Sequence, residues 1–149
     1  MENLDKSEHE LTKLLIVEDD QVHRMIIRKC ASTVSLDAEE ASSCEAAIRL
    51  LDSGTYDCMT LDLSIGSRDG LDVLQHLVGS GRRMPILVVS GGEPGQLQAV
   101  TDYAEKFQLP ILFTMKKPMD LAALKVLLVE LKKLADQGRS VRKAWRITA

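Results

Sequence analysis

The stretch that decides the fold reads LLIVEDD at residues 14–20, a short apolar run that stops at charged side chains. Two further stretches follow the same pattern: CMTLDL at 58–63 and ILFTMKKP at 111–118. A continuous apolar run of this length is typical of a parallel strand that is buried on both faces. In an open α/β sheet, ligands bind beyond the carboxyl ends of the strands. We therefore expect Glu18, Asp19, Asp62 and Lys117 to converge in one crevice.

Strand-like and helix-like segments alternate five times along the chain. Parallel strands need helical crossovers, so this alternation predicts one parallel sheet with helices on both faces. The fold class is therefore α/β, a three-layer sandwich around a five-stranded parallel sheet. The expected strands are 13–18, 36–41, 57–62, 85–90 and 111–115, and the acidic segment 36–41 suits a sheet edge.

Local signals mark several helix ends. Ser42 followed by Glu45 is a capping-box pattern, and Gly54 is a typical helix stop. A glycine-rich turn at 91–95 precedes an expected helix at 96–107, and Asp120 can cap a last helix at 121–136.

The 149 residues suit a single domain. We expect a flexible lead at 1–12, the folded domain at 13–136 and a basic tail at 137–149 that holds Trp145 and lacks acidic residues. The tail has two readings, a solvated chain end or an arm that docks on a partner or a second subunit.

Composition narrows the function classes. Hydrophobic residues make up 45% and charged residues 28%, as in a globular protein. Aromatic residues are only 3% and the net charge is −3, so neither base stacking nor nucleic-acid or membrane binding is expected. Three cysteines without a CxxC pair or a leader-like start indicate free thiols in the cytoplasm.

The expected crevice suits a divalent cation and a phosphoryl group. A carboxylate attacks an anionic phosphoryl group only when their mutual repulsion is cancelled, and Mg²⁺ held by carboxylate oxygens does this. Glu18 and Asp19 would hold the ion, and Asp62 would share it. Lys117 would neutralise a phosphoryl oxygen, and Ser90 would donate a hydrogen bond to another.

The chain resembles bacterial response-regulator receiver domains of the single-domain, chemotaxis-regulator-like kind. The likeness spans about residues 12–135 and rests on LIVEDD at 15–20, YDCMTLDL at 56–63, DGLDVL at 69–74, PILVVSG at 85–91 and KP at 117–118. It implies a (βα)₅ flavodoxin-like fold that works as a switch rather than an enzyme.

The resemblance also implies the role of each site residue. Asp62 would accept a phosphoryl group from a sensor histidine kinase or a phosphotransfer protein. Glu18, Asp19, Asp62 and the backbone carbonyl of Ser64 would form the Mg²⁺ site. Ser90 and Lys117 would be the switch and phosphate-binding residues, and the Lys117–Pro118 bond would be cis.

Three features depart from the family pattern. Thr114 stands where receivers usually carry an aromatic residue, with Phe113 beside it, and Gly66 replaces a common proline. Residues 109–118 are more similar to receivers attached to cyclic-di-GMP phosphodiesterases. An aromatic switch at residue 114 is therefore not expected, and the readout should rest on residues 91–107.

The output is expected to be a downstream protein that reads a face comprising Thr114, Leu121, Leu124 and Leu128. The last helix is unusually apolar, so a homodimer through it, strengthened by phosphorylation, is also expected.

Other function classes stay open at this point. The chain could be an adaptor or dimerisation module that works without phosphorylation, or the receiver fragment of a longer regulator. A haloacid-dehalogenase-like phosphatase would need an acid at Ser64, and a flavodoxin-like carrier would need a phosphate loop in place of Glu18 and its acidic neighbours.

Overall fold

The computed structural model describes residues 11–65, 68–91 and 94–148, with side chains up to residue 138 apart from residues 68, 69, 94, 111 and 112. Residues 1–10 of the predicted lead at 1–12, Gly66, part of the turn at 91–95 and the Trp145 side chain lie outside this description. The elements are β1 (Thr12–Val17), α2 (Gln21–Thr33), β2 (Leu36–Ala41), α3 (Cys44–Ser53), β3 (Cys58–Asp62), β4 (Ser64–Ile65), β5 (Arg68–Asp69), α4 (Leu71–Ser80), β6 (Ile86–Ser90), α5 (Pro94–Phe107), β7 (Ile111–Lys116) and α6 (Leu121–Thr148).

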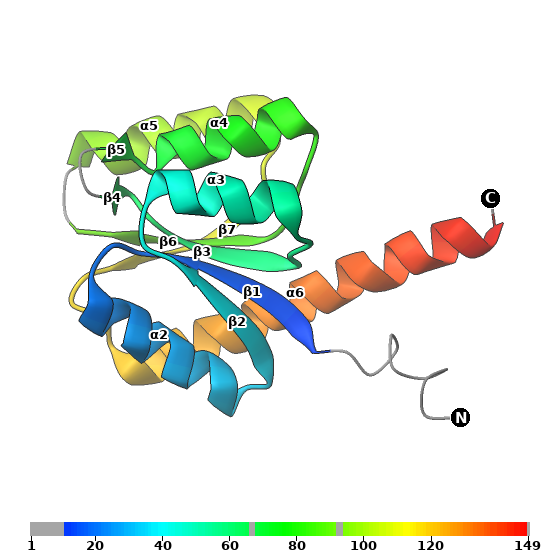
Figure 1. Cartoon of the computed structure of the whole chain (residues 1–149), viewed down its shortest axis with the longest axis horizontal. Helices are drawn as coiled ribbons and strands as arrows, with labels where there is room; N and C mark the ends of the chain where they lie inside the picture. The colour runs from blue at the N-terminus through cyan, green and yellow to red at the C-terminus, as the bar shows by residue number, and fades with distance from the viewer. Residues whose placement is uncertain (1–10, 66–67, 92–93, 149) are drawn as a thin grey trace.

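One five-stranded parallel sheet forms the centre of the molecule. Its strand order is β2-β1-β3-β6-β7, which is the flavodoxin-like order. All neighbouring strands are parallel, and the side of the sheet to which successive strands are added changes between β1 and β3. Helices α3, α4 and α5 cover one face, and α2 and α6 cover the other (Figure 1). The predicted fold class is confirmed, and the acidic segment 36–41 is the edge strand β2 as expected.

Each central strand is buried on both sides because its alternate residues enter two different cores. In β1, Leu15 and Val17 join the core under α3, α4 and α5, whereas Leu14 and Ile16 join the core under α2 and α6. All four side chains are at most 1% exposed. This double burial is the physical reason for an unbroken apolar run.

Two of the predicted helix-end signals are in place, and two other predictions need correction. Asp120 accepts from the Ala122 backbone N–H at 3.0 Å, and Gly54 follows the last residue of α3. The cap of α3 is Ser43 rather than Ser42, because Ser43 accepts from the Ala46 N–H at 3.0 Å. Helix α5 begins at Pro94, two residues earlier than expected. Proline fits the first turn of a helix because a backbone N–H at that position would have no acceptor within the helix.

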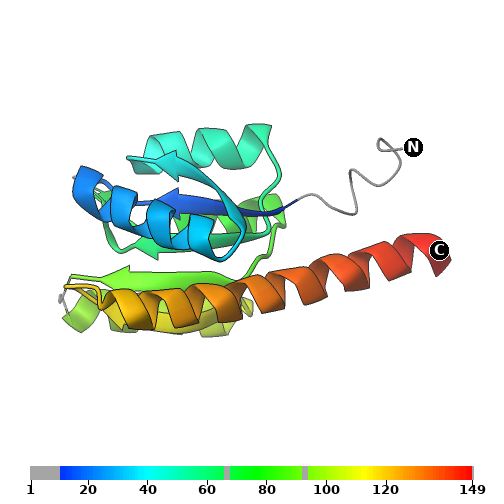
Figure 2. The same cartoon turned by 90° about the horizontal axis from the view of Figure 1, so that it is seen from below.

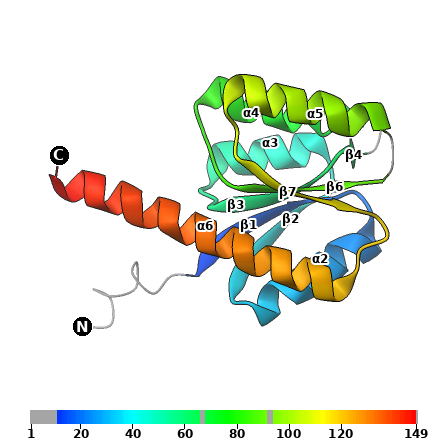
Figure 3. The same cartoon turned by 180° about the vertical axis from the view of Figure 1, so that it is seen from behind.

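Helix α6 was predicted to end at residue 136, and that prediction is wrong. The helix continues to Thr148, and its last turns project beyond the sheet (Figures 2 and 3). At residue 136 the helix is tied to the sheet, because Asp136 accepts a hydrogen bond from the Thr12 hydroxyl on β1. Residues 139–148 contain neither proline nor glycine, so no local signal stops the helix once it passes Gly138.

A short hairpin follows the central strand. Strands β4 and β5 pair antiparallel, and Gly70 then returns beneath the end of β3. A Cβ at residue 70 would lie 2.8 Å from the Asp62 carbonyl oxygen and 3.1 Å from the Leu63 Cα. Only glycine allows this approach, which lets the Gly70 N–H donate to the Leu63 carbonyl at 2.9 Å.

The described helices include none that is both long enough and apolar enough to cross a membrane. Cys30, Cys44 and Cys58 form no disulfide. Burial raises the pKa of the Cys58 thiol, so this group stays protonated and packs as a small apolar residue.

Candidate functional site

The central acids lie side by side because of the strand register. Strands β1 and β3 pair from Leu14 with Cys58 up to Val17 with Leu61, so Glu18 and Asp62 come next at the carboxyl edge. Both side chains are buried, with 1% and 2% of their surface exposed. Two buried carboxylates repel each other, so this arrangement needs a cation to be favourable.

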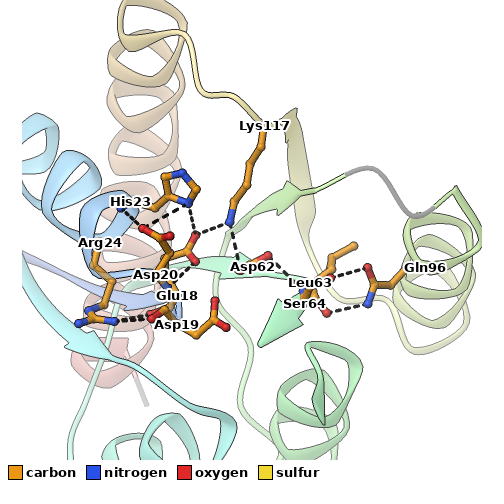
Figure 4. Close-up of polar contacts among 10 residues, drawn as sticks. All are labelled: Glu18, Asp19, Asp20, His23, Arg24, Asp62, Leu63, Ser64, Gln96 and Lys117. Atoms are coloured by element: carbon orange, nitrogen blue, oxygen red, sulfur yellow. Dashed lines mark hydrogen bonds and ion pairs between the residues drawn. The ribbon is translucent and has the colours of Figure 1, made fainter. Parts of the chain in front are cut away.

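Lys117 supplies a positive charge from the end of β7. Its Nζ lies 2.9 Å from Glu18 Oε1 and 3.3 Å from Asp62 Oδ2, so one ammonium joins the two acids (Figure 4). Burial opposes the charged form of the lysine, but its bonds to Glu18 and Asp62 outweigh burial and raise the pKa of Lys117. The peptide bond between Lys117 and Pro118 is cis.

Glu18 is the strained acid of the site. The pKa of its carboxyl is raised from 4.5 to about 7, because burial and the neighbouring Asp62 raise it more than Lys117 and the Asp20 N–H lower it. The Asp20 N–H donates to Glu18 Oε2 at 3.1 Å. One ammonium and one backbone donor therefore do not fully compensate the burial of this carboxylate.

Asp19 completes a group of three acids. One carboxylate oxygen from each of Glu18, Asp19 and Asp62 lies within 4.8 Å of the others, and Asp19 is the exposed member. Oxygen ligands on opposite sides of Mg²⁺ are about 4.2 Å apart, at twice the ordinary metal–oxygen distance. The spacing of these three acids, and their all-oxygen donor set, therefore fit this ion.

Arg24 on α2 holds the backbone of the acidic pair. Its Nη1 donates to the Glu18 and Asp19 carbonyls, both at 3.0 Å, and its Nε donates to Glu40 Oε1 at 3.1 Å (Figure 4 shows the first two bonds). The sequence analysis missed this residue. The available signal was an arginine one turn into the helix that follows the acids, a position from which a guanidinium reaches back over the helix start.

The loop after Asp62 is held from two directions. The Ser64 N–H donates to Asp62 Oδ1 at 3.1 Å, so it holds the carboxylate oxygen that Lys117 does not contact. From α5, Gln96 Nε2 donates to the Leu63 carbonyl at 2.9 Å, and Gln96 Oε1 accepts from the Ser64 hydroxyl at 3.1 Å. Gln96 is the second residue that the sequence analysis missed, because its partners lie more than 30 residues away in the chain.

The predicted switch residues lie on the neighbouring strands. Ser90 ends β6, is 3% exposed, and stands at the same sheet edge as Asp62, whose partner in the register is Val89. Thr114 on β7 is exposed. Phe113 packs on the opposite side, against the core under α2 and α6, so it does not replace an aromatic residue at position 114.

The partner face predicted on α6 needs a correction. Leu124 and Leu128 are completely buried against the sheet and belong to the core. A helix that covers a sheet buries the apolar residues that recur every three or four positions on one face. Leu124, Leu128 and Leu131 form such a series in α6. Leu121, which belongs to the predicted face, is 56% exposed, and Val126 is 61% exposed, so only part of that face lies at the surface.

Comparison with protein-family models gives a match over residues 14–128 to the response regulator receiver domain. The regulator of RpoS from Escherichia coli K12 is 30% identical over 107 residues, which cover 72% of this chain and 30% of that protein. The response regulator MprA of Mycobacterium tuberculosis H37Rv is 32% identical over 78 residues, covering 52% of this chain and 34% of MprA. The chain thus spans about a third of the length of these relatives.

Solved structures share the fold. A receiver domain protein from Clostridium thermocellum aligns with a TM-score of 0.71 at 16% identity, covering 88% of this chain and 99% of that one. A response regulator from Colwellia psychrerythraea aligns with a TM-score of 0.69 at 22% identity, covering 83% and 98%. The likeness of residues 109–118 to receivers of cyclic-di-GMP phosphodiesterases stays a prediction.

Proposed function

Because the chain belongs to the response regulator receiver domain family, we propose that it is a phosphorylation-dependent signalling switch in which Asp62 accepts the phosphoryl group. One observation carries this proposal. Asp62 is a buried carboxylate that ends the central strand, 3.3 Å from the Lys117 ammonium and beside two further acids. A buried acid in this setting contributes little to a core but is well placed for phosphoryl transfer.

The reaction uses Asp62 as a nucleophile. A carboxylate oxygen of Asp62 forms a bond to phosphorus while the bond between phosphorus and the donor breaks. In a kinase the broken bond joins phosphorus to a histidine nitrogen, and in acetyl phosphate it joins phosphorus to the carboxylate oxygen. The bonding electron pair leaves with the donor. Asp62 Oδ1 is fixed by the Ser64 N–H and Oδ2 is oriented by Lys117, so the nucleophile is held before the donor arrives.

Glu18, Asp19, Asp62 and the backbone carbonyl of Ser64 would hold Mg²⁺. When bound there, Mg²⁺ cancels the repulsion between the attacking carboxylate and the phosphoryl oxygens. Glu18 supplies a carboxylate that stays costly to ionise even beside the Lys117 ammonium, since its pKa is about 7. Arg24 keeps the acidic pair in place through the two backbone carbonyls.

Lys117 and Ser90 stabilise the phosphoryl group once it is attached. The lysine is close enough to Asp62 to act as a point charge on a phosphoryl oxygen. Ser90 ends the adjacent strand and donates its hydroxyl to another oxygen. The readout then passes through α5, because this chain has Thr114 where an aromatic switch would stand.

The donor is a sensor histidine kinase or a phosphotransfer protein, and the reader is a downstream output protein. Three cysteines that form no disulfide, two of them buried, suit the reducing cytoplasm as the compartment. Self-association through α6 is part of the proposal, carried by exposed Leu121 and Val126. Sedimentation with and without a phosphoryl mimic tests it, and a monomer at high concentration in both states would contradict it.

Intact-mass spectrometry after incubation with acetyl phosphate and Mg²⁺ tests the central proposal. Wild type should gain one phosphoryl group, and Asp62→Asn should gain none. Asp57→Asn is the matched control, because Asp57 lies just before the same strand but at the opposite end, where it accepts from the Lys13 N–H. Equal labelling of Asp62→Asn and wild type would contradict the proposal.

A further inference from the structure

Gln96 connects helix α5 to the two residues that follow the proposed phosphoacceptor. Its amide nitrogen donates to the Leu63 carbonyl at 2.9 Å, and its amide oxygen accepts from the Ser64 hydroxyl at 3.1 Å. Figure 4 shows the side chain reaching across from α5 to both groups. The donor end of the amide meets an acceptor and the acceptor end meets a donor, so the orientation of this group is fully determined.

The contact is specific to this position of the helix. Gln98, two residues further along, donates instead to Asp102 within α5 at 2.8 Å, as an ordinary surface pair one turn apart does. Gln96 is half-buried, and its partners are 33 and 32 residues away in the chain. Gln96 therefore joins α5 to the loop after β3. Within the part of the chain that the structure describes, no backbone–backbone hydrogen bond links α5 to Leu63 or Ser64.

The tie continues directly to Asp62. Ser64 receives the Gln96 contact through its side chain and donates its backbone N–H to Asp62 Oδ1 at 3.1 Å. Leu63 accepts from both Gln96 and the Gly70 N–H, so its carbonyl is held by two donors. A displacement of α5 would therefore be felt at the Asp62 carboxylate through only one intervening residue.

We propose that Gln96 is a positioning residue that couples helix α5 to the phosphoacceptor loop. This inference rests on the proposed function and deepens it. Receivers commonly link the site to their surface through a hydroxyl and an aromatic side chain, and this chain lacks the aromatic at residue 114. Gln96 provides a second path, in which the loop that carries the Ser64 carbonyl and α5 hold one another in place.

The proposal separates a coupling role from a merely structural one. A structural hydrogen bond would change only the stability of the fold. A positioning residue changes the affinity of the site for a phosphoryl mimic, and it changes how far the effect of that mimic spreads into α5. Both quantities are measurable with beryllium fluoride and Mg²⁺ as the probe.

The experiment compares wild type, Gln96→Ala and Gln98→Ala. Titration with beryllium fluoride at saturating Mg²⁺ gives the affinity, and hydrogen exchange of residues 94–107 with and without the probe gives the spread. Gln96→Ala should bind the probe about 2- to 13-fold more weakly, the range that corresponds to the net free energy of a typical hydrogen bond. The probe-induced change in exchange over α5 should be largely lost, and Gln98→Ala should behave as wild type.

Two further variants sharpen the result. Ser64→Ala combined with Gln96→Ala should weaken binding by less than the two single changes added together, because both remove the same contact. Gln96→Glu keeps the size of the side chain and an acceptor for the Ser64 hydroxyl but cannot donate to the Leu63 carbonyl. It should bind the probe at least as weakly as Gln96→Ala, and it guards against an effect of lost volume.

The outcomes distinguish this inference from the function it rests on. If wild type binds the probe and Gln96→Ala equals wild type in both affinity and exchange, the coupling role is wrong and the switch proposal stands. If wild type fails to bind the probe with Mg²⁺, the proposed function is wrong, and the role of Gln96 is overturned with it.

Discussion

Asp62 stands between two flanks that hold it by different forces. On the acidic flank, Glu18 and Asp19 follow β1, and the contacts there are ionic or involve a guanidinium. On the loop flank, Ser64 and Gln96 form neutral hydrogen bonds, and Gly70 fits tightly beneath the strand end. The acidic flank therefore responds to pH and to cations, whereas the loop flank responds to small changes of shape.

This difference assigns separate tasks to the two flanks. The buried carboxylates of the acidic flank lie where the cation and the phosphoryl group would bind, so binding of the cation would lower the free-energy cost of burying these charges. Neutral bonds of fixed geometry stand where the site meets α5, and they transmit position without contributing charge.

Removing the lysine should have the largest effect on the chemistry. Lys117→Ala leaves Glu18 and Asp62 without the ammonium that joins them, and phosphorylation by acetyl phosphate should slow by about 10²-fold, as when one preorganised charge-stabilising group is lost. Lys116→Ala is the control, because the preceding lysine is exposed. Initial rates from intact-mass measurements decide, and equal rates for Lys117→Ala and Lys116→Ala would contradict the role of Lys117.

Neutralising the strained acid should stabilise the ion-free protein, and more so as pH rises. The pKa of Glu18 is about 7 in the fold against 4.5 ordinarily. Between these values the unfolded chain ionises while the folded protein stays protonated, so wild type loses stability as pH rises through this window. Glu18→Gln does not titrate, so its advantage should grow from near zero below pH 4.5 to on the order of 3 kcal/mol above pH 7.

Urea unfolding with a chelator, at several pH values, measures this advantage. Saturating Mg²⁺ is the control condition, because binding to the native state should restore the stability of wild type relative to Glu18→Gln. A difference between the two proteins that stays constant across pH 4.5 to 8 in the absence of metal would show that Glu18 is not the strained group.

Filling the space at the loop flank should destabilise the fold without any dependence on pH. Gly70→Ala places a methyl group 2.8 Å from the Asp62 carbonyl oxygen, and the shift this forces should cost about 2 kcal/mol. Gly79→Ala is the matched control, because a Cβ at residue 79 meets nothing within 4 Å and the residue lies within α4. Thermal unfolding should show a loss for the first variant and a gain of about 0.5–1 kcal/mol for the second.

Releasing the backbone of the acidic pair should weaken metal binding by a smaller factor. Arg24→Ala removes the donors to the Glu18 and Asp19 carbonyls, and the affinity for Mg²⁺ should fall about 10-fold, as when an outer-shell contact is lost. Arg28→Ala is the control, because Arg28 pairs with the same Glu40 at 2.6 Å but has no recorded bond to the site. Calorimetry that finds equal affinities for the two variants would place the support of the acids elsewhere.

The sequence was sufficient for the fold and for the acids, because both depend on short patterns. The apolar run at 14–17 and the charges that follow it define a buried strand and its carboxyl end in one stretch. Register then brings Glu18 beside Asp62 without further information. The same logic placed β2 at the sheet edge, since a strand with three acids is not buried on both faces.

The supporting residues were not predictable in this way. Arg24 and Gln96 are ordinary polar residues of amphipathic helices, and their partners become visible only when the helices are placed against the sheet. The prediction of the exposed face of α6 was partly wrong for a related reason. Leu124 and Leu121 share one apolar pattern, and only packing decides that the first is buried while the second is 56% exposed.

The end of α6 shows a limit of a different kind. The helix continues past residue 136, its predicted end, and past Gly138, because a single glycine costs only about 1 kcal/mol and the residues beyond it do not oppose a helix. Composition distinguished the tail from the domain, but composition does not determine where a helix stops.

Locating the phosphoryl group chemically tests the central claim most directly. Borohydride reduces an aspartyl phosphate to homoserine, which marks the acceptor residue permanently. After treatment with acetyl phosphate and Mg²⁺, peptide mapping of wild type should find homoserine at residue 62 and aspartate unchanged at residue 19. Homoserine at another position, or none in a protein that has gained the mass of a phosphoryl group, would contradict the assignment of Asp62 as the phosphoacceptor.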